Sequence, residues 1–234
     1  MTVATDLHIH SCLSPCGDGG MTPADLVGMS LLNGQRLIAL TDHNTARNCP
    51  AAASAAAAYG IGFIPGVEVT TSEDIHVVCL FADLGSALDF DAFLYSRIPD
   101  VPNRPDIFGE QVIYDVDGDP CGTEPKLLIT GCDISILELP AIIKTYGGIC
   151  YPAHIDREGN GLLSILGAWP TELDVDAAEI SYRVEGDGGG MGIPDGIRIV
   201  RASDAHYLQD LPRNGFDIEM ESPDFAGLAR WIAG

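Results

Sequence analysis

Basic residues are scarce in this sequence, and their scarcity limits what the protein can bind. Twelve Lys and Arg residues stand against 34 Asp and Glu residues, so the formal net charge is −22 at pH 7. A surface of that charge repels the phosphate backbone of nucleic acids, and no cluster of basic residues offsets it locally. We therefore predict that long nucleic acids are not partners of this chain.

Long apolar segments are missing as well. No apolar run approaches the roughly 20 residues that cross a bilayer, and the opening MTVATDLHIH has neither the basic start nor the apolar core of a secretory signal. The seven cysteines are odd in number and scattered, which is typical of reduced thiols. Cys12 and Cys16 form a C-x3-C pair, but no second pair completes a thiolate metal site. These features predict a cytoplasmic protein with no membrane partner.

The rest of the sequence is that of a globular α/β protein. The chain has 234 residues, 46% of them hydrophobic, which is enough for one domain with a sizeable core. Short apolar runs alternate with helix-like stretches, the pattern of parallel strands joined by helices. After a first strand ending in DLHIH, the pattern predicts strands near 36–44, 61–69, 75–82, 147–155, 177–182 and 197–206, and helices near 23–32, 51–59, 136–146, 162–166 and 225–233.

Residues from about 85 to 135 interrupt this alternation. The segment QVIYDVDGDPCGTEPKLLIT is typical of a β-hairpin or an extended insertion. Asp115, Asp117 and Asp119 resemble a calcium loop, but the glycine is misplaced and the terminal Glu is absent, so a turn is favoured. We predict one domain over 1–234 with an insertion at about 85–135.

All six histidines lie in short motifs suited to metal binding. Imidazole is the commonest nitrogen ligand for zinc-like metals, and four of these motifs place a His beside or one residue from an Asp. Any one His taken alone is more often an ordinary core or surface residue, but six out of six indicate one site assembled by the fold. The motifs are DLHIH (His8, His10), TDHN (His43), DIHVV (His76), PAHI (His154) and SDAH (His206).

The motifs fall at strand ends, which places them in one region. Residues i and i+2 of a strand point to the same face, so His8 and His10 form one pair of ligands, and Asp204 and His206 form another. Glu68 ends a run that would be buried, where a carboxylate is costly unless it is paired or binds metal. The carboxyl ends of barrel strands meet at one mouth. We therefore expect a common metal site there.

In this order, HIH, TDHN, the Glu of PGVEV, HVV, PAH and SDAH resemble the motifs of the PHP (polymerase and histidinol phosphatase) superfamily. The resemblance covers nearly the whole chain and implies a distorted (β/α)7 barrel, two to three divalent metals (zinc, manganese or iron) and phosphoester hydrolysis. It implies one metal held by His8, His10, Glu68 and Asp204, a second by Asp18, His43 and His206, and a third by Glu68, His76 and His154. A neighbour in the CGDGG segment could take the place of Asp18.

The function predicted is hydrolysis of small phosphorylated molecules, such as nucleotides or sugar phosphates, by a metal-activated water. Asp18 and His206 are the candidate catalytic residues, and Arg157 and Arg183 are candidate phosphate-binding residues, because guanidinium binds phosphate bidentately. The alternatives are an exonuclease on short oligonucleotides, an amidohydrolase-like metal hydrolase and a non-catalytic metal-binding module. The amidohydrolase alternative is disfavoured because neither lysine, Lys126 or Lys144, ends a predicted strand. Native metal, physiological substrate and oligomeric state stay open.

Overall fold

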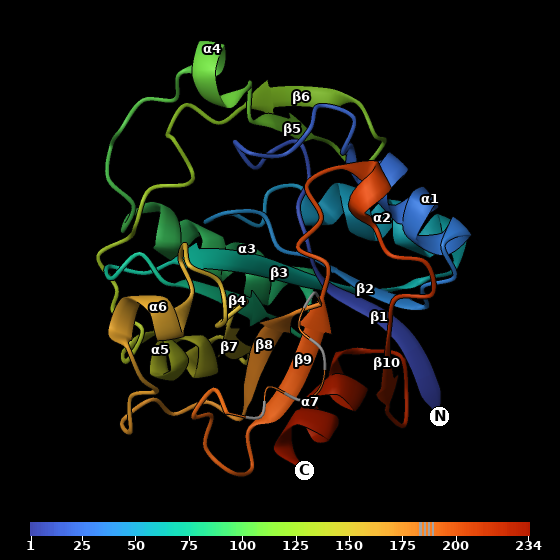
Figure 1. Cartoon of the computed structure of the whole chain (residues 1–234). Helices are drawn as coiled ribbons and strands as arrows, with labels where there is room; N and C mark the ends of the chain where they lie inside the picture. Colours follow the sequence, from blue (N-terminus) through green and yellow to red (C-terminus); the bar gives the residue numbers. More distant parts are fainter. Residues whose placement is uncertain (183, 185, 187, 189) are drawn as a thin grey trace.

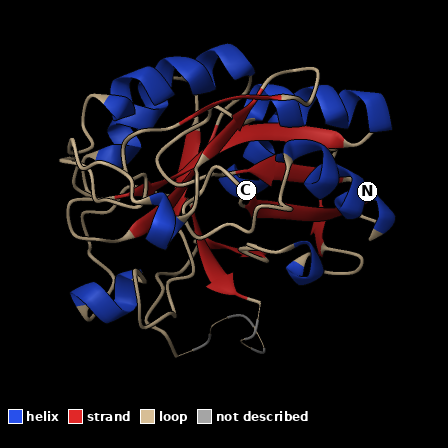
Figure 2. Ribbon diagram, turned by 90° about the horizontal axis from the view of Figure 1, so that it is seen from above, coloured by secondary structure: helices blue, strands red, loops and turns tan. Residues whose placement is uncertain are grey.

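The computed structural model describes every residue except 183, 185, 187 and 189 (Figure 1). It is a mixed α/β fold in which helices surround a strongly curled sheet (Figure 2). Within the described part of the chain, no helix is long and apolar enough to cross a membrane. The strands are β1 (Thr2–Ile9), β2 (Leu37–Leu40), β3 (Gly62–Thr70), β4 (His76–Leu80), β5 (Val112–Tyr114), β6 (Pro120–Thr123), β7 (Ile149–Pro152), β8 (Ala177–Ser181), β9 (Arg198–Ala202) and β10 (Phe216–Glu219).

The helices follow from local sequence signals. Pro23 begins α1 and the Thr22 hydroxyl accepts a hydrogen bond from the Asp25 amide, which is a typical N-terminal cap. Gly60 ends the alanine-rich α2 in a left-handed conformation that glycine adopts without strain. The helices are α1 (Pro23–Leu32), α2 (Cys49–Tyr59), α3 (Leu84–Tyr95), α4 (Pro105–Phe108), α5 (Leu139–Thr145), α6 (Leu162–Leu166), α7 (Phe225–Ala233) and the 3-10 helix η1 (Leu208–Asp210).

The curled sheet is consistent with a distorted barrel, although the count of seven βα units stays a prediction. Its main part has the order β10-β1-β2-β3-β4-β7, and β8 and β9 form a parallel pair. Backbone hydrogen bonds join this pair to both sides of the curl: the His10 amide donates to the Ala205 carbonyl, and the Ile155 amide donates to the Glu179 carbonyl.

The expectation of uniformly parallel strands is wrong at β4, which runs antiparallel to both β3 and β7. Only residues 71–75 separate β3 from β4. A parallel crossover needs a dozen or more residues, so this short connection forces the chain to turn back. The reversal brings the beginning of β4 to the edge where β3 ends, and His76 pairs with Thr70 there.

Buried side chains fill both faces of the sheet. Ile38 and Leu40 of β2 pack against the apolar face of α1, which includes Leu26. Leu37 and Ala39, which alternate with them along the strand, pack inside the curl together with Leu228 and Ile232 of α7, the helix at the lower end in Figure 1.

The predicted interruption at about 85–135 contains more regular structure than the sequence indicated. Its first residues form α3, which buries Ala87, Phe90 and Leu94 in the core. The hairpin expected further on is present as the antiparallel pair β5–β6. At its tip the Asp115 carboxylate accepts the backbone amides of Asp117 and Asp119, the turn chemistry that the sequence analysis favoured over a calcium loop. The limits of an inserted segment remain a prediction.

Candidate metal centre

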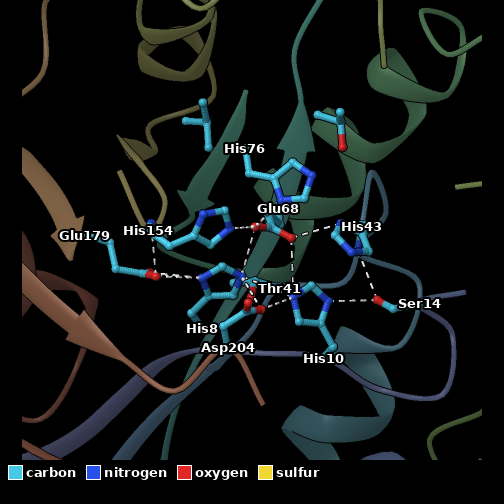
Figure 3. A network of polar contacts seen from close by, with 12 residues as sticks. His8, His10, Ser14, Thr41, His43, Glu68, His76, His154, Glu179 and Asp204 are labelled. Carbon is cyan, nitrogen blue, oxygen red and sulfur yellow. Dashed lines mark hydrogen bonds and ion pairs between the residues drawn. The ribbon is translucent and has the colours of Figure 1, made fainter. Parts of the chain in front are cut away.

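The six histidines converge with Glu68 and Asp204 at one edge of the sheet, and all of these residues except His206 are labelled in Figure 3. His8 lies near the end of β1 and His10 just after it, while His43, His154 and Asp204 follow other strands. His76 reaches the same edge from the opposite direction, because β4 is antiparallel.

Glu68 on β3 is at the centre of the cluster and is fully buried. Both of its carboxylate oxygens face imidazole nitrogens. Glu68 Oε1 lies 2.9 Å from His76 Nδ1, 3.1 Å from His8 Nε2 and 3.3 Å from His154 Nε2, and Oε2 lies 2.9 Å from His43 Nδ1 and 3.3 Å from His10 Nε2.

Asp204 is the second carboxylate of the cluster. Its Oδ1 lies 3.0 Å from His10 Nε2 and 3.3 Å from His8 Nε2, and its side chain is only 6% exposed. Asp204 and His154 both have positive φ angles, 52° and 27°. Such backbone conformations are costly for residues other than glycine and are concentrated at functional sites.

Three sets of these residues bring possible ligand atoms within 4.8 Å of one another. The set His8, His10, Glu68 and Asp204 has the composition that the sequence resemblance implied for one metal. A second set contains His43 and His206 with His10, and not Asp18. The third contains Glu68 and His76 with His43, while His154 reaches Glu68 from the other side (Figure 3).

Asp18 does not join the cluster, contrary to the expectation from the resemblance. Its carboxylate is exposed and accepts a hydrogen bond from the Gly20 amide at 2.8 Å, so it closes its own turn. Its backbone amide donates to the His206 carbonyl. The nearest member of the CGDGG segment is instead Cys16, whose Sγ lies 3.2 Å from His43 Nε2.

The contacts inside the cluster suit a metal better than hydrogen bonding. His43 Nδ1 and Glu68 Oε2 are 2.9 Å apart, yet both are buried atoms without a hydrogen-bond partner among the described residues. Asp204 Oδ1 is in the same condition. His8 Nε2 faces His10 Nε2 at 3.1 Å, where at most one of the two nitrogens can donate. Converging lone pairs of this kind fit divalent cations.

The pKa values reflect how strongly these groups depend on one another. Burial disfavours the charged form of His10, but the Asp204 and Glu68 carboxylates outweigh it and raise the pKa to about 9. Burial alone would raise the pKa of Glu68, but the surrounding histidines, with His76 first, hold that pKa well below its usual range. His206 behaves differently, because burial and the neighbouring His10 lower its pKa to about 3. The cluster is thus a compact, charged and poorly solvated site.

Outer residues hold the candidate ligands in place, and the sequence analysis missed them. Glu179 Oε2 lies 2.9 Å from His8 Nδ1, so the other nitrogen of that ring faces the cluster. Ser14 Oγ lies 2.9 Å from His10 Nδ1 and donates to the Asp42 carboxylate. Partners of this kind orient metal-binding imidazoles. A carboxylate inside the apolar run AAEISY was the available signal for Glu179.

The two arginines predicted to bind phosphate have different outcomes. Arg157 Nη1 lies 2.5 Å from Asp204 Oδ2, and its side chain is 41% exposed, so it stands at the open side of the cluster. Arg183 lies outside the described residues.

The protein thus combines a curled α/β sheet with a buried cluster of His and carboxylate side chains at the edge where most of its strands end. Residues 6–104 match the family model of the PHP domain, which confirms the resemblance found in the sequence over that part of the chain. The chain is 41% identical over 81 residues to a 3',5'-nucleoside bisphosphate phosphatase of Chromobacterium violaceum, covering 33% of this chain and 27% of that protein. It is 40% identical over 86 residues to a 5'-3' exoribonuclease of Haemophilus influenzae, covering 36% and 30%.

A solved structure, endonuclease Q in complex with a 27-mer duplex, superposes with a TM-score of 0.72. The match covers 100% of this chain and 57% of that chain at 17% identity, so it shows a shared fold. The present chain aligns with less than a third of the length of each of these two relatives. The matched relatives are named as a phosphatase and an exoribonuclease, and the clustered His, Glu and Asp side chains of this chain could hold metal ions.

Proposed function

We propose that this protein hydrolyses phosphoesters in small phosphorylated molecules with two to three divalent metals at the Glu68 cluster. The observation that carries the proposal is Glu68 itself, whose two oxygens lie within 3.3 Å of nitrogens from five histidines. A carboxylate so placed can bridge neighbouring cations. When bound, clustered divalent ions activate water for attack on phosphorus and neutralise charge that develops on the leaving group.

The chain's own residues supply position and charge. Glu179 and Ser14 hold the His8 and His10 rings, so that the free nitrogen of each ring stays directed at the cluster. Arg157 is the proposed phosphate-binding residue, because its guanidinium is half-exposed beside Asp204 and can contact a phosphate oxygen at the open side. Zinc, manganese and iron all fit this ligand set, and the native metal stays a prediction.

The surface charge supports a small substrate. A net charge of −22 gives a long polyanion no favourable field, whereas a metal cluster attracts one terminal phosphate. The similarity to the Chromobacterium enzyme supports the same proposal, because a nucleoside bisphosphate is a small molecule. Endonuclease Q, by contrast, was solved with duplex DNA, so the fold itself does not exclude a long nucleic acid. The preference for a small substrate therefore follows from the surface charge.

An exonuclease that acts on short oligonucleotides is the second candidate function. The similarity to the Haemophilus exoribonuclease favours it, and the chemistry at phosphorus would be the same. An amidohydrolase-like site is not supported by the lysines. Lys126 Nζ donates to backbone carbonyls of Tyr95 and Ile98, and Lys144 pairs with the exposed Asp174, so both are engaged outside the cluster.

The proposed function is tested with full-length protein loaded with manganese or zinc. We expect turnover of phosphomonoesters, mononucleotides or short oligonucleotides, lost on adding a chelator and restored by metal. Efficient internal cutting of long duplex DNA, with no hydrolysis of any small ester, would contradict the proposed substrate size. A protein that binds metal but hydrolyses no phosphoester would support a non-catalytic metal-binding module instead.

Two variants separate metal binding from phosphate binding. His206→Ala should lose metal and activity together, since His206 belongs to a ligand set. Arg157→Ala should raise KM or lower kcat while the metal content stays close to that of the wild type. Asp133→Asn, at an exposed carboxylate that pairs with Arg97 and belongs to none of the ligand sets, is the control and should change neither.

A further inference from the structure

A groove of about 870 Å³ is lined by two residues that neighbour the candidate ligand His206. That volume is within the usual range for small-molecule sites. Most of the lining belongs to residues 207–213, which include η1, and α1, which lies next to η1 (Figure 1), contributes Met29. Asp18 and Tyr207 both line the groove. The Asp18 amide donates to the His206 carbonyl, and Tyr207 follows His206 in the chain.

The backbone around Tyr207 is held on both sides. Ala205 forms a parallel bridge with Ile9 of β1, and the Asp210 amide donates to the Tyr207 carbonyl at 2.9 Å. These contacts fix the backbone of Tyr207 next to the candidate ligand His206. The side chain itself is 47% exposed, so one large aromatic surface faces solvent at the groove.

The groove lining is aromatic and carries more negative than positive charge. Tyr182, 44% exposed, contributes a second ring, and its centroid lies 6.4 Å from that of Phe216. The charged residues of the lining are two carboxylates, Asp18 and Asp210, and one guanidinium, that of Arg213. Such a lining does not attract a second phosphate. It suits a flat, neutral ring whose amino groups can donate to carboxylates.

We propose that this groove binds the nucleobase of a substrate whose phosphate lies at the metal centre. The base stacks on Tyr207, and exocyclic amino groups donate to the carboxylates of the lining. This inference rests on the proposed phosphoesterase function and narrows its substrate class to nucleotides that carry an amino-substituted base. A sugar phosphate would leave the groove empty.

The test compares adenosine 5'-monophosphate with ribose 5-phosphate, which has the same phosphate and sugar but no base. In metal-loaded protein, Tyr207→Ala should reduce the preference for the nucleotide, measured as the ratio of kcat/KM values, about tenfold. Tyr207→Phe keeps the ring and should keep the preference. Tyr59→Ala is the matched control, because Tyr59 is 49% exposed and does not line the groove.

Equilibrium binding of adenosine gives a second measurement that does not depend on hydrolysis. We expect Tyr207→Ala to weaken adenosine binding about tenfold, with unchanged metal content. Equal losses on both phosphate esters, or adenosine binding that ignores Tyr207, would overturn the base-binding groove and leave the phosphoesterase proposal standing. Wild-type protein that binds adenosine through Tyr207 but hydrolyses neither ester would contradict the proposed function and support the groove.

Discussion

Glu68 shows how one buried side chain organises a whole site. A fully buried carboxylate is unfavourable unless its charge is compensated, and here five imidazoles surround it. His76, by comparison, is 12% exposed and contacts only one of the two carboxylate oxygens. The two residues should therefore differ in how many metals depend on them.

We predict that Glu68→Gln releases at least two metals from the protein, whereas His76→Ala releases chiefly one. Glutamine keeps the shape of the side chain but removes the charge that would bridge two cations. Metal content per chain, measured by mass spectrometry after dialysis, decides the outcome. The Asp133→Asn protein serves as reference. Equal loss of a single metal in both variants would show that Glu68 is not a bridge.

At the scale of elements, the docking of the β5–β6 hairpin depends on polar contacts. Glu124, next to β6, is 2% exposed, pairs with Arg47 and accepts a hydrogen bond from the Tyr95 hydroxyl. The Asn48 side chain accepts from the Tyr114 amide and donates to the Val112 carbonyl of β5. Because the exposed strand β6 buries little apolar surface, these contacts carry much of the attachment.

We predict that Glu124→Ala lowers the free energy of unfolding by about 2 kcal/mol. The change removes the buried acceptor of the Tyr95 hydroxyl and leaves Arg47 with its longer, 3.6 Å contact to the buried Asp91, and Arg47 is partly solvated, which moderates the cost. Asp133→Ala breaks the exposed pair with Arg97 and should change stability by less than about 0.5 kcal/mol. Urea unfolding followed by circular dichroism measures both. Similar small effects from the two variants would show that the hairpin is held by other contacts.

At the scale of the whole molecule, the excess of acidic residues makes bound cations important for stability. The chain carries 34 acidic and 12 basic residues, and two buried carboxylates, Glu68 and Asp204, lie in one cluster. Divalent ions that bind only the folded chain stabilise it by mass action and remove repulsion among carboxylates.

We predict that a chelator lowers Tm by at least about 5 °C. Metal at 100 times its dissociation constant contributes about 2.7 kcal/mol, and about 2–4 °C per kcal/mol is usual at this chain length. Scanning calorimetry with and without manganese or zinc measures the shift. Added potassium chloride should recover part of the loss in the chelated protein, since it screens the acidic surface. An unchanged Tm after verified metal removal would contradict this coupling.

Local patterns in the sequence predicted most of the elements outside 85–135 and singled out most of the residues that the fold gathers at the cluster. The strand period places His8 and His10 on one face, and His43, His154 and Asp204 each follow a short apolar run that forms its own strand. Pro23 and Gly60 mark helix ends in the same local way. These features depend on neighbours a few residues apart, so they are visible without the fold.

The arrangement between distant segments became known only in three dimensions. Glu179 meets His8 across 171 positions, and no local pattern pairs them. The reversal of β4, the turn that directs Asp18 away while Cys16 faces His43, and the groove beside Tyr207 depend likewise on how separate elements pack. Short-range periodicity sets which residues reach a strand end. Only the packing of the strands decides which of those residues meet.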